Sequence, residues 1–488
     1  MFENTFKNID QILWKDDGCS TELDYIEQTS WIIFLKYLED LEIETSSAYK
    51  LMGKKYDLIF DESYRWSKWA YPKLNNGKQD HDSTLLGNDL INFVNQKLFP
   101  YLSNFKKKND NINSLEYKIG QIFDSSRSGV RNKIESGYNL REIIDHVEKL
   151  KFRSKKDKDE MSHLYEDKIK NMGNAGRNGG EFYTPRPLIS TMVSLINPKI
   201  GNKIFDPSCG SAGFLVESFN YLKNKKNLTT SNMKLIQEKT LFGKEKKSLP
   251  FIIGNMNMIL HGIQSPNIIR TNTLNENILD FTEKDKYDVI LANPPFGGKE
   301  RSEIKNNFPI KTKETANLFL QYFCRSLKNN GKCAVIVKNT ILSNNLTLAD
   351  ALIRKELITK YNLHTILDLP RNVFSSPVKT VVLFFEKKNK TKNIWYYELN
   401  LNKNLGKRNP LSFDHLKDFK NLFNSRKDTI NSWTNNIENI DKNTYDLSVV
   451  NPNKKKEVNI RDPKIIYDEI NEFNKKIKNK INYIEKNI

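Results

Sequence analysis

Apolar residues recur at helical spacing over roughly the first third of the chain. In STELDYIEQTSWIIFLKYLEDLE, residues 20–42, they fall three or four positions apart from Leu23 to Leu41. Thr21 and Asp24 stand at capping-box spacing just ahead of this run. Two later segments, NDLINFVNQKLFPYL and YNLREIIDHVEKL, repeat the same period. These patterns predict a helical N-terminal domain over residues 1–155.

From about residue 170 the pattern changes to short β-rich runs that alternate with helical ones. The runs are NKIFD, DVILA, KCAVIVKN, HTILDLP and KTVVLFFEK, and several are apolar on both faces. Such runs predict buried parallel strands with helices between them, that is, a doubly wound, mostly parallel α/β sheet over residues 156–400. Only the short segment RNVFSSPV separates the last two runs, which predicts an antiparallel pair at one edge of the sheet. The charged stretch over 151–172 fits either a linker or a solvated helix.

The remaining segment, residues 401–488, is polar until Asp462-Pro463, which is a favourable helix start. An apolar stripe then follows at spacings of three and four: Ile466, Ile470, Phe473, Ile477, Ile481, Ile484 and Ile488. The stripe suits either a flap on the body of the protein or a seam for a helix of another chain. The seam is favoured, because the rest of this helix is highly charged.

Composition narrows the class of protein. The chain of 488 residues holds 78 Lys and Arg against 59 Asp and Glu, a formal net charge of +19. This excess favours a polyanionic partner, nucleic acid before an anionic membrane, although codon bias toward Lys would give the same charge. The four cysteines show no paired spacing, and no apolar run approaches the ~18 residues of a membrane span. We expect a soluble cytoplasmic protein.

Two strand ends carry residues suited to ligand binding, because ligands in open α/β sheets bind beyond the carboxyl ends of the strands. In FDPSCGSAGF a strand ends at Asp206, and the small residues Gly210 to Gly213 lead into a helix. Such a turn allows close backbone approach and offers free N–H groups, although it also suits a plain tight turn. A second strand ends at Glu245, which is either a ribose-binding acid or a surface carboxylate.

The stretch ILANPPFGGKE forms a third and more specific strand end. Asn293 offers an amide oxygen and Pro294 a carbonyl, and the prolines fix the backbone because their rings lock φ. Phe296 adds a flat stacking surface. Two converging acceptors beside a ring make a receptor for a planar group that bears an NH2, such as adenine.

The ordered motifs resemble a known family. GEFYTPRPLISTMV, DPSCGSAGF, NMNMILHG, TNTL, NPPF and LPRNVFSSPVKTVVLFF look like the modification subunit of type I restriction-modification systems. These subunits are N6-adenine DNA methyltransferases that use S-adenosyl-L-methionine. The resemblance extends to the helical N-terminus and to YDLSVVNPN, and so covers most of the chain. It implies the class I S-adenosylmethionine-dependent methyltransferase fold, with residues 1–155 contacting DNA and partners.

The resemblance also assigns roles to positions of this sequence. Residues that resemble the cradle for the methionine end of the cofactor are Glu181, Phe182, Tyr183, Thr184, Pro185 and Arg186. The residues that match the cofactor-binding turn are Asp206, Gly210, Ser211, Ala212 and Gly213. Glu245 matches the acid that binds the ribose, and Asn272 matches a position near the adenine of the cofactor. Asn293, Pro294, Pro295 and Phe296 match the catalytic motif.

This chain departs from the family pattern at two places. Ala212 stands where many relatives have glycine, and alanine fits there only if its φ is negative. The strand AVIVKNTILSN also lacks the Pro-x-Gly that is common after it in relatives.

The receptor suggests a mechanism that requires no metal. The Asn293 oxygen and the Pro294 carbonyl would accept the two hydrogens of the adenine amine and direct its lone pair at the sulfonium methyl. The target adenine must be flipped out of the duplex, with Phe296 stacking on it, although ordinary core packing would also explain this ring.

Partners follow from the resemblance as well. It implies a separate specificity subunit that reads the site on double-stranded DNA, with two modification subunits per specificity subunit, and the terminal helix is a candidate for that contact. The sequence holds no G-x-x-x-x-G-K phosphate loop, so a restriction or translocase subunit, where one accompanies the protein, is another chain.

Other readings of the motifs stay open at this point. A cytosine-C5 methyltransferase is excluded, because no Cys here follows a Pro. Methylation of RNA or of a protein glutamine would suit a similar Asn-Pro-Pro motif. A non-catalytic DNA-binding or assembly subunit with a degenerate site is the third alternative, for which Ala212 is the argument.

Overall fold

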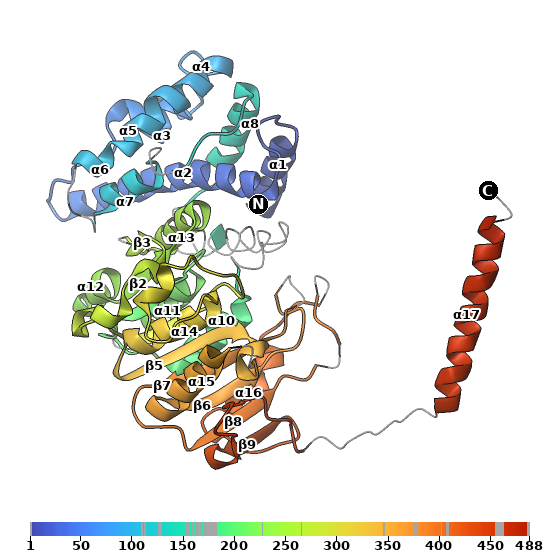
Figure 1. Ribbon diagram of the computed structural model, residues 1–488. Helices are drawn as coiled ribbons and strands as arrows, with labels where there is room; N and C mark the ends of the chain where they lie inside the picture. The colour runs from blue at the N-terminus through green and yellow to red at the C-terminus, as the bar shows by residue number, and fades with distance from the viewer. Residues whose placement is uncertain are drawn as a thin grey trace.

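The computed structural model begins with a group of N-terminal helices, and a large sheet with its own helices lies below them in the view of Figure 1. It describes residues 2–108, 111, 114–124, 129–152, 157, 160–161, 165, 168, 183–226, 228–264, 266–344, 347–374, 378–401, 403–406, 409–453 and 463–485. Most of the charged stretch over 151–172, together with Glu181 and Phe182, therefore lies outside the described residues.

The N-terminal region is helical, as its apolar spacing predicted. Its helices are α1 (Phe2–Trp14), α2 (Glu22–Leu51), α3 (Trp66–Trp69), α4 (Gly87–Asn92), α5 (Phe99–Ser103), α6 (Phe105–Lys108), α7 (Leu115–Ile122) and α8 (Gly137–Glu148), with a π-helical turn at Phe93–Leu98. The capping box is present, because Asp24 N–H donates to Thr21 Oγ1 at 3.2 Å and the Asp24 carboxylate accepts from Thr21 N–H at 2.9 Å. Helix α2 buries Trp31 to Phe34 completely, so it forms the centre of this domain.

The catalytic region alternates strands and helices. Its strands are β1 (Ile204–Asp206), β2 (Leu241–Glu245), β3 (Ile268–Arg270), β4 (Tyr287–Ala292), β5 (Leu327–Lys338), β6 (Asn362–Asp368), β7 (Thr380–Glu386), β8 (Asn393–Glu398) and β9 (Ser432–Asn436). Its helices are α10 (Arg186–Ile196), α11 (Gly213–Lys223), α12 (Thr230–Lys239), α13 (Ser248–Leu260), α14 (Thr315–Ser326), α15 (Leu348–Lys360) and α16 (Lys417–Leu422), followed by α17 (Pro463–Glu485). Short 3-10 helices lie at Glu62–Tyr64, Thr273–Asn275, Ile278–Asp280, Glu283–Asp285, Ile304–Asn307, Asn339–Leu342, Asp414–Leu416 and Ile437–Asn439.

All nine strands of the described residues join one sheet, in the order β3-β2-β1-β4-β5-β7-β6-β8-β9. Strands β1 to β5 pair in parallel, and β6 pairs in parallel with β8. This arrangement confirms the doubly wound, mostly parallel sheet. It also brings the ends of β1, β2 and β4 to the same edge, so that the three predicted ligand-binding strand ends are neighbours.

The antiparallel pair is present but lies inside the sheet, not at its edge. Strands β6 and β7 are antiparallel, as the short connection between them predicted. Strands β8 and β9, which the sequence analysis did not predict, then extend the sheet beyond β6. The predicted edge position was therefore wrong. The two added strands pair onto β6 and are stabilised there by apolar burial, since the rings of Trp395 on β8 and Trp433 on β9 are buried.

Two hydrophobic cores cover the two faces of the sheet. Leu291 of β4 packs with α10, α11 and α13, while its neighbour Ile290 packs with α14 and α15. This alternation explains why DVILA is apolar throughout, since both faces of the strand are buried. The first core continues into the N-terminal helices, because α13 contacts α2 and α7. Figure 1 shows these helices lying over the end of the molecule that holds α13.

Helix α17 differs from the rest of the chain in burying almost nothing. It begins at Pro463, and its apolar stripe is exposed, with Ile470 at 52% and Phe473 at 63%. In Figure 1 it stands apart from the other elements. The described residues therefore provide no intrachain cover for this stripe. Across the described chain, none of the helices has the length and apolar character needed to cross a bilayer.

Candidate active site

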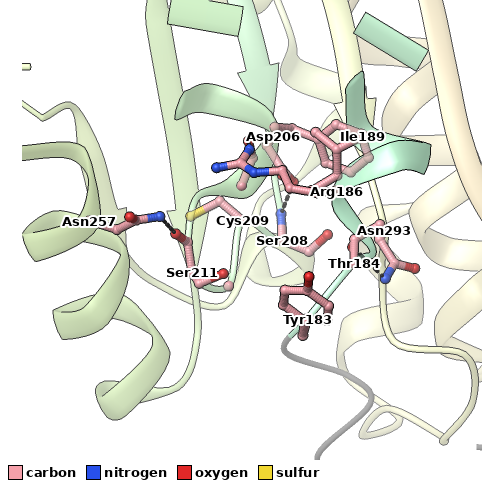
Figure 2. A pocket seen from close by; sticks show the side chains of 13 residues that line it. Tyr183, Thr184, Arg186, Ile189, Asp206, Ser208, Cys209, Ser211, Asn257 and Asn293 are labelled. Carbon is pink, nitrogen blue, oxygen red and sulfur yellow. Dashed lines mark hydrogen bonds between the residues drawn. The ribbon is translucent and has the colours of Figure 1, made fainter. Parts of the chain in front are cut away.

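A pocket opens at the edge of the sheet where β1 and β4 end (Figure 2). Its space, open mouth included, is about 500 Å³, within the range of small-molecule sites. It is lined by the segment before α10, the turn between β1 and α11, one residue of α13 and the end of β4: Tyr183, Thr184, Arg186, Ile189, Asp206, Ser208, Cys209, Gly210, Ser211, Gly213, Phe214, Asn257 and Asn293. The fold thus brings together in one cavity the described residues Tyr183, Thr184 and Arg186 of EFYTPR, most of the DPSCGSAGF turn and Asn293 of NPPF.

The turn between β1 and α11 adopts two left-handed residues. Gly210 has φ 51°, and Ala212, which caps α11, has φ 64° and ψ 26°. The expectation that alanine requires a negative φ here was therefore wrong. A left-handed alanine costs roughly 1–2 kcal/mol, yet Ala212 is completely buried and its N–H donates to the Cys209 carbonyl at 2.7 Å. The tight turn forms despite the substitution.

Glu245 fixes this turn from the neighbouring strand. Its Oε2 accepts from Gly210 N–H at 2.9 Å, and its Oε1 accepts from Lys247 N–H at 2.8 Å. Burial is the largest influence on its pKa and raises it, while these backbone N–H groups act in the opposite direction. Glu245 is absent from the residues that line the pocket, and it lies behind the turn. Its role toward a ribose stays a prediction.

Asp206 lies deeper than Glu245 and is only 2% exposed. Its Oδ1 accepts from Ser208 N–H at 3.1 Å. Burial, and to a lesser extent the nearby Glu245 charge, raises the pKa of Asp206 well above its usual range. Two buried carboxyl groups therefore lie at this turn, Asp206 in the pocket lining and Glu245 outside it, and the Glu245 charge disfavours ionisation of Asp206.

Asn293 is held in a defined orientation at the end of β4. Its Nδ2 donates to Thr184 Oγ1 at 3.0 Å, across 109 residues of sequence. Its Oδ1 is buried and has no hydrogen-bond partner among the described residues. Figure 2 shows the two side chains meeting at the pocket wall. A buried acceptor without a donor is costly, and in a pocket it marks the place where a ligand can donate.

Phe296 lies beside this wall, next to a residue that the sequence analysis did not single out. Its ring is 9% exposed and meets the ring of Phe374 edge-on, with centroids 5.0 Å apart and planes at 72°. Phe374 belongs to the connection between β6 and β7 that was read only as a loop. Pro294 is buried and Pro295 is partly exposed, as expected for a rigid corner.

The remaining predicted residues lie around the pocket at different distances. Asn272 caps the 3-10 helix that follows β3, where its side chain accepts from Leu274 N–H at 3.3 Å, and it does not line the pocket. Pro185 precedes α10, whose Arg186 donates to the Gly213 carbonyl at 3.2 Å. Asn257, which was missed, donates to the Ser211 carbonyl at 2.9 Å. Its only signal in the sequence was its place in NMNMILHG.

The residues that the structure describes contain no cluster of three or more His, Cys, Asp or Glu side chains arranged for a metal ion. The polar atoms of the lining belong to backbone groups, amides, hydroxyls, the Asp206 carboxyl and the Arg186 guanidinium. This donor set suits an organic ligand with several hydrogen-bonding groups.

Comparisons with known proteins identify the family of the chain. The N-6 DNA Methylase family matches residues 156–460, and the HsdM N-terminal domain family matches residues 2–147. The methylase subunit of the type I restriction enzyme EcoEI from Escherichia coli is 34% identical over 464 residues, which is 92% of this chain and 90% of that protein. The StySJI methylase subunit from Salmonella typhimurium is 28% identical and covers 84% of this chain and 75% of its own length.

Solved structures give the same result. A modification subunit from Vibrio vulnificus aligns with a TM-score of 0.80 at 33% identity, covering 93% of this chain and 96% of that one. A chain solved in a study of complex assembly in a type I restriction-modification system aligns with a TM-score of 0.78 at 33% identity, covering 99% and 97%. The chain therefore belongs to the N-6 DNA methylase family, among the modification subunits of type I restriction-modification systems, which methylate adenine in DNA at N6.

Proposed function

We propose that the pocket holds S-adenosyl-L-methionine and that Asn293 and Pro294 present to it the N6 amine of an adenine turned out of duplex DNA. The observation that carries this proposal is made at Asn293, a residue of the pocket lining whose buried Oδ1 atom lacks a donor among the described residues. An amine that brings two N–H donors supplies what this atom lacks.

The residues of the pocket fit the cofactor. Gly210, Ser211 and Gly213 bring backbone close to the cavity at the start of α11, where the positive end of the helix dipole favours an anionic group such as a carboxylate. Ser208 Oγ is a second buried polar atom of the lining without a partner among the described residues. Tyr183 and Arg186 close the opposite side. These residues would hold the methionine end of the cofactor.

When bound, the cofactor supplies a methyl group on a positively charged sulfur. The adenine amine is a weak nucleophile, because its lone pair is delocalised into the ring. Asn293 Oδ1 and the Pro294 carbonyl accept its hydrogens, which favours a tetrahedral nitrogen with the lone pair free. Phe296, supported edge-on by Phe374, supplies an aromatic face for the extruded base.

Asn293→Ala tests the assignment. Removal of one such acceptor typically lowers the rate by about two to three orders of magnitude. We expect methylation of adenine to fall by at least that factor, while the dissociation constant of S-adenosylmethionine from calorimetry changes little, since the side chain faces the base. Asn435→Ala, a substitution of the same type on β9, serves as the control. Near-normal turnover by Asn293→Ala would disprove the role.

We further propose that this chain acts in a complex with a specificity subunit, two modification subunits to each specificity subunit, on double-stranded DNA. The solved relative from a type I assembly supports membership in such a complex. The net charge of +19 favours contact with DNA phosphates. The exposed stripe of α17 is the surface of this chain best suited to a helix of the specificity subunit. Light scattering of the purified complex would give the ratio of subunits.

A further inference from the structure

An asparagine amide has two ends of nearly equal size and opposite hydrogen-bonding character. The oxygen accepts two hydrogen bonds, and the nitrogen donates two. A catalytic amide that accepts hydrogen bonds from an amine must point its oxygen at that amine. If the amide were rotated by 180°, its own N–H groups would face the N–H groups of the amine, and no hydrogen bond could form. The orientation and plane of the Asn293 amide therefore decide whether the corner works.

The structure supplies a group that holds this amide. Thr184 Oγ1 accepts from Asn293 Nδ2 at 3.0 Å, and the buried Oδ1 atom of the same amide has no donor among the described residues. Asn293 is only 8% exposed, so water has little access to replace the bond. Donation by Nδ2 also polarises the amide, and this increases the partial negative charge on its oxygen. One hydroxyl thus fixes the amide plane and strengthens the acceptor.

Thr184 has a position that suits this task. It precedes α10, and its neighbours Tyr183 and Arg186 line the cofactor side of the same pocket. Arg186 also donates to the Gly213 carbonyl at the start of α11, which ties the segment to the cofactor turn. Thr184 therefore connects the wall that faces the cofactor with the residue that faces the base.

We propose that Thr184 is a positioning residue for catalysis, whose hydroxyl holds the Asn293 amide with its oxygen toward the adenine amine. This inference rests on the proposed function and deepens it. Thr184 acts through Asn293, so its loss should affect the rate of methyl transfer and leave the affinity for the cofactor in place.

The test uses the complete complex with its specificity subunit and cognate DNA. Thr184→Val keeps the shape of the side chain and removes the hydroxyl, and it should lower kcat on the order of ten- to a hundredfold. The KM for DNA and the dissociation constant of S-adenosylmethionine should stay within about twofold, since the proposal places the hydroxyl on the Asn293 amide and not on either ligand. The family resemblance, which assigns Thr184 to the cofactor cradle, predicts a loss of cofactor affinity instead. Thr184→Ser, which restores the hydroxyl, should recover most of the lost rate.

Controls separate this inference from the function on which it rests. Thr359→Val removes an exposed hydroxyl on α15 that donates to the Lys355 carbonyl, and it should leave kcat unchanged. If Asn293→Ala is inactive while Thr184→Val turns over normally, the positioning role is wrong and the proposed function survives. If Asn293→Ala is active, the function itself fails.

Two further outcomes would overturn the role of Thr184 alone. One is a loss of cofactor affinity in Thr184→Val that matches its loss of rate, because Thr184 would then be an ordinary cofactor contact. The other is a Thr184→Ser variant as slow as Thr184→Val. Should Thr184→Val fail to fold, Thr184→Ala removes the same hydroxyl without a β-branched side chain, and the same comparison with Thr184→Ser applies.

Discussion

At the scale of single residues, the turn between β1 and α11 is held by two carboxyl groups that are expensive to ionise. Asp206 and Glu245 are both buried, and burial raises both pKa values. Each accepts backbone N–H groups of the turn between β1 and α11, so each shapes the cofactor site while it lowers the stability of the empty protein at neutral pH. The two buried carboxyl groups therefore lower the folding stability of the protein, and in return they fix the conformation of the turn between β1 and α11.

The raised pKa of Asp206 leads to a prediction about pH. Because the folded state binds the Asp206 proton more tightly than the unfolded chain does, folding stability falls as pH rises from the unfolded pKa of about 3.9 toward the folded pKa. Asp206→Asn is neutral at every pH and avoids this loss. The urea concentration at its unfolding midpoint should therefore rise relative to that of the native chain as pH increases from 4 to 8.

Asp80→Asn provides a control with the opposite sign. Hydrogen bonds from Ser83 lower the pKa of Asp80, so its carboxylate stabilises the folded state above the unfolded pKa. Removing it should lower the midpoint relative to that of the native chain as pH rises up to the unfolded pKa of about 3.9, and the difference should then stay level up to pH 8. An Asp206→Asn advantage that stays constant across this range would show that the gain does not come from ionisation.

At the scale of elements, α13 is the support of the cofactor turn. It contacts β2, β3 and α11 on one side and α2 and α7 of the N-terminal domain on the other. Its Asn257 holds the Ser211 carbonyl, and Gly254 lets the helix approach the turn closely. A Cβ atom at Gly254 would lie 2.7 Å from the Gly210 carbonyl oxygen. The distance between α13 and the turn therefore depends on one missing methyl group.

Gly254→Ala should consequently weaken the site. Alanine favours a helix by about 1 kcal/mol over glycine, but the contact with a backbone carbonyl forces the turn to move, and overpacking of this kind costs roughly 1–3 kcal/mol. We expect a higher dissociation constant for S-adenosylmethionine, measured by calorimetry, and a lower unfolding temperature. Gly406→Ala, where no atom lies within 4 Å of the added Cβ, is the matched control. Unchanged cofactor affinity in Gly254→Ala would contradict the support role.

At the scale of the whole molecule, one core is continuous from the N-terminal helices to a face of the sheet, and α17 contributes nothing to it. A helix with an exposed apolar stripe is seldom stable alone, and tertiary or intermolecular packing normally supplies its stability. We therefore propose that this part of the chain acts in assembly and not in folding of the catalytic body.

Substitutions on the two faces of α17 test this division. Ile470→Asp with Ile477→Asp should abolish co-purification with the specificity subunit, because charge would enter the apolar seam. Asn471→Asp with Asn479→Asp adds the same charge away from the stripe and should leave assembly intact. Neither pair should move the unfolding temperature of the isolated chain by more than a degree or so, since surface changes rarely alter stability by more than about 0.5 kcal/mol. Equal binding by both pairs would exclude the stripe as the seam.

The sequence by itself determined most of the helices and strands, and it predicted ligand-binding residues at the ends of β1 and β4, where the pocket lies. Helical and alternating periods are local, and so are the capping box at Thr21 and the corner at Asn293, which is why they could be predicted. The family motifs in order identified the fold and the reaction. The extension of the sheet by β8 and β9 was not predicted. These two segments become strands because they pair with a sheet formed by earlier parts of the chain, and this pairing leaves no local pattern in the sequence.

Only the tertiary structure decided how the site residues are held. Nothing in the local sequence shows that Thr184 binds the Asn293 amide across 109 residues, or that Phe374 meets Phe296. Ala212 adopts a left-handed backbone that its side chain disfavours, because Glu245 and α13 fix the turn around it. Local propensities predict the backbone conformation that a segment adopts most easily. Packing and buried hydrogen bonds can force a different conformation on a residue, and only the tertiary structure shows where this happens.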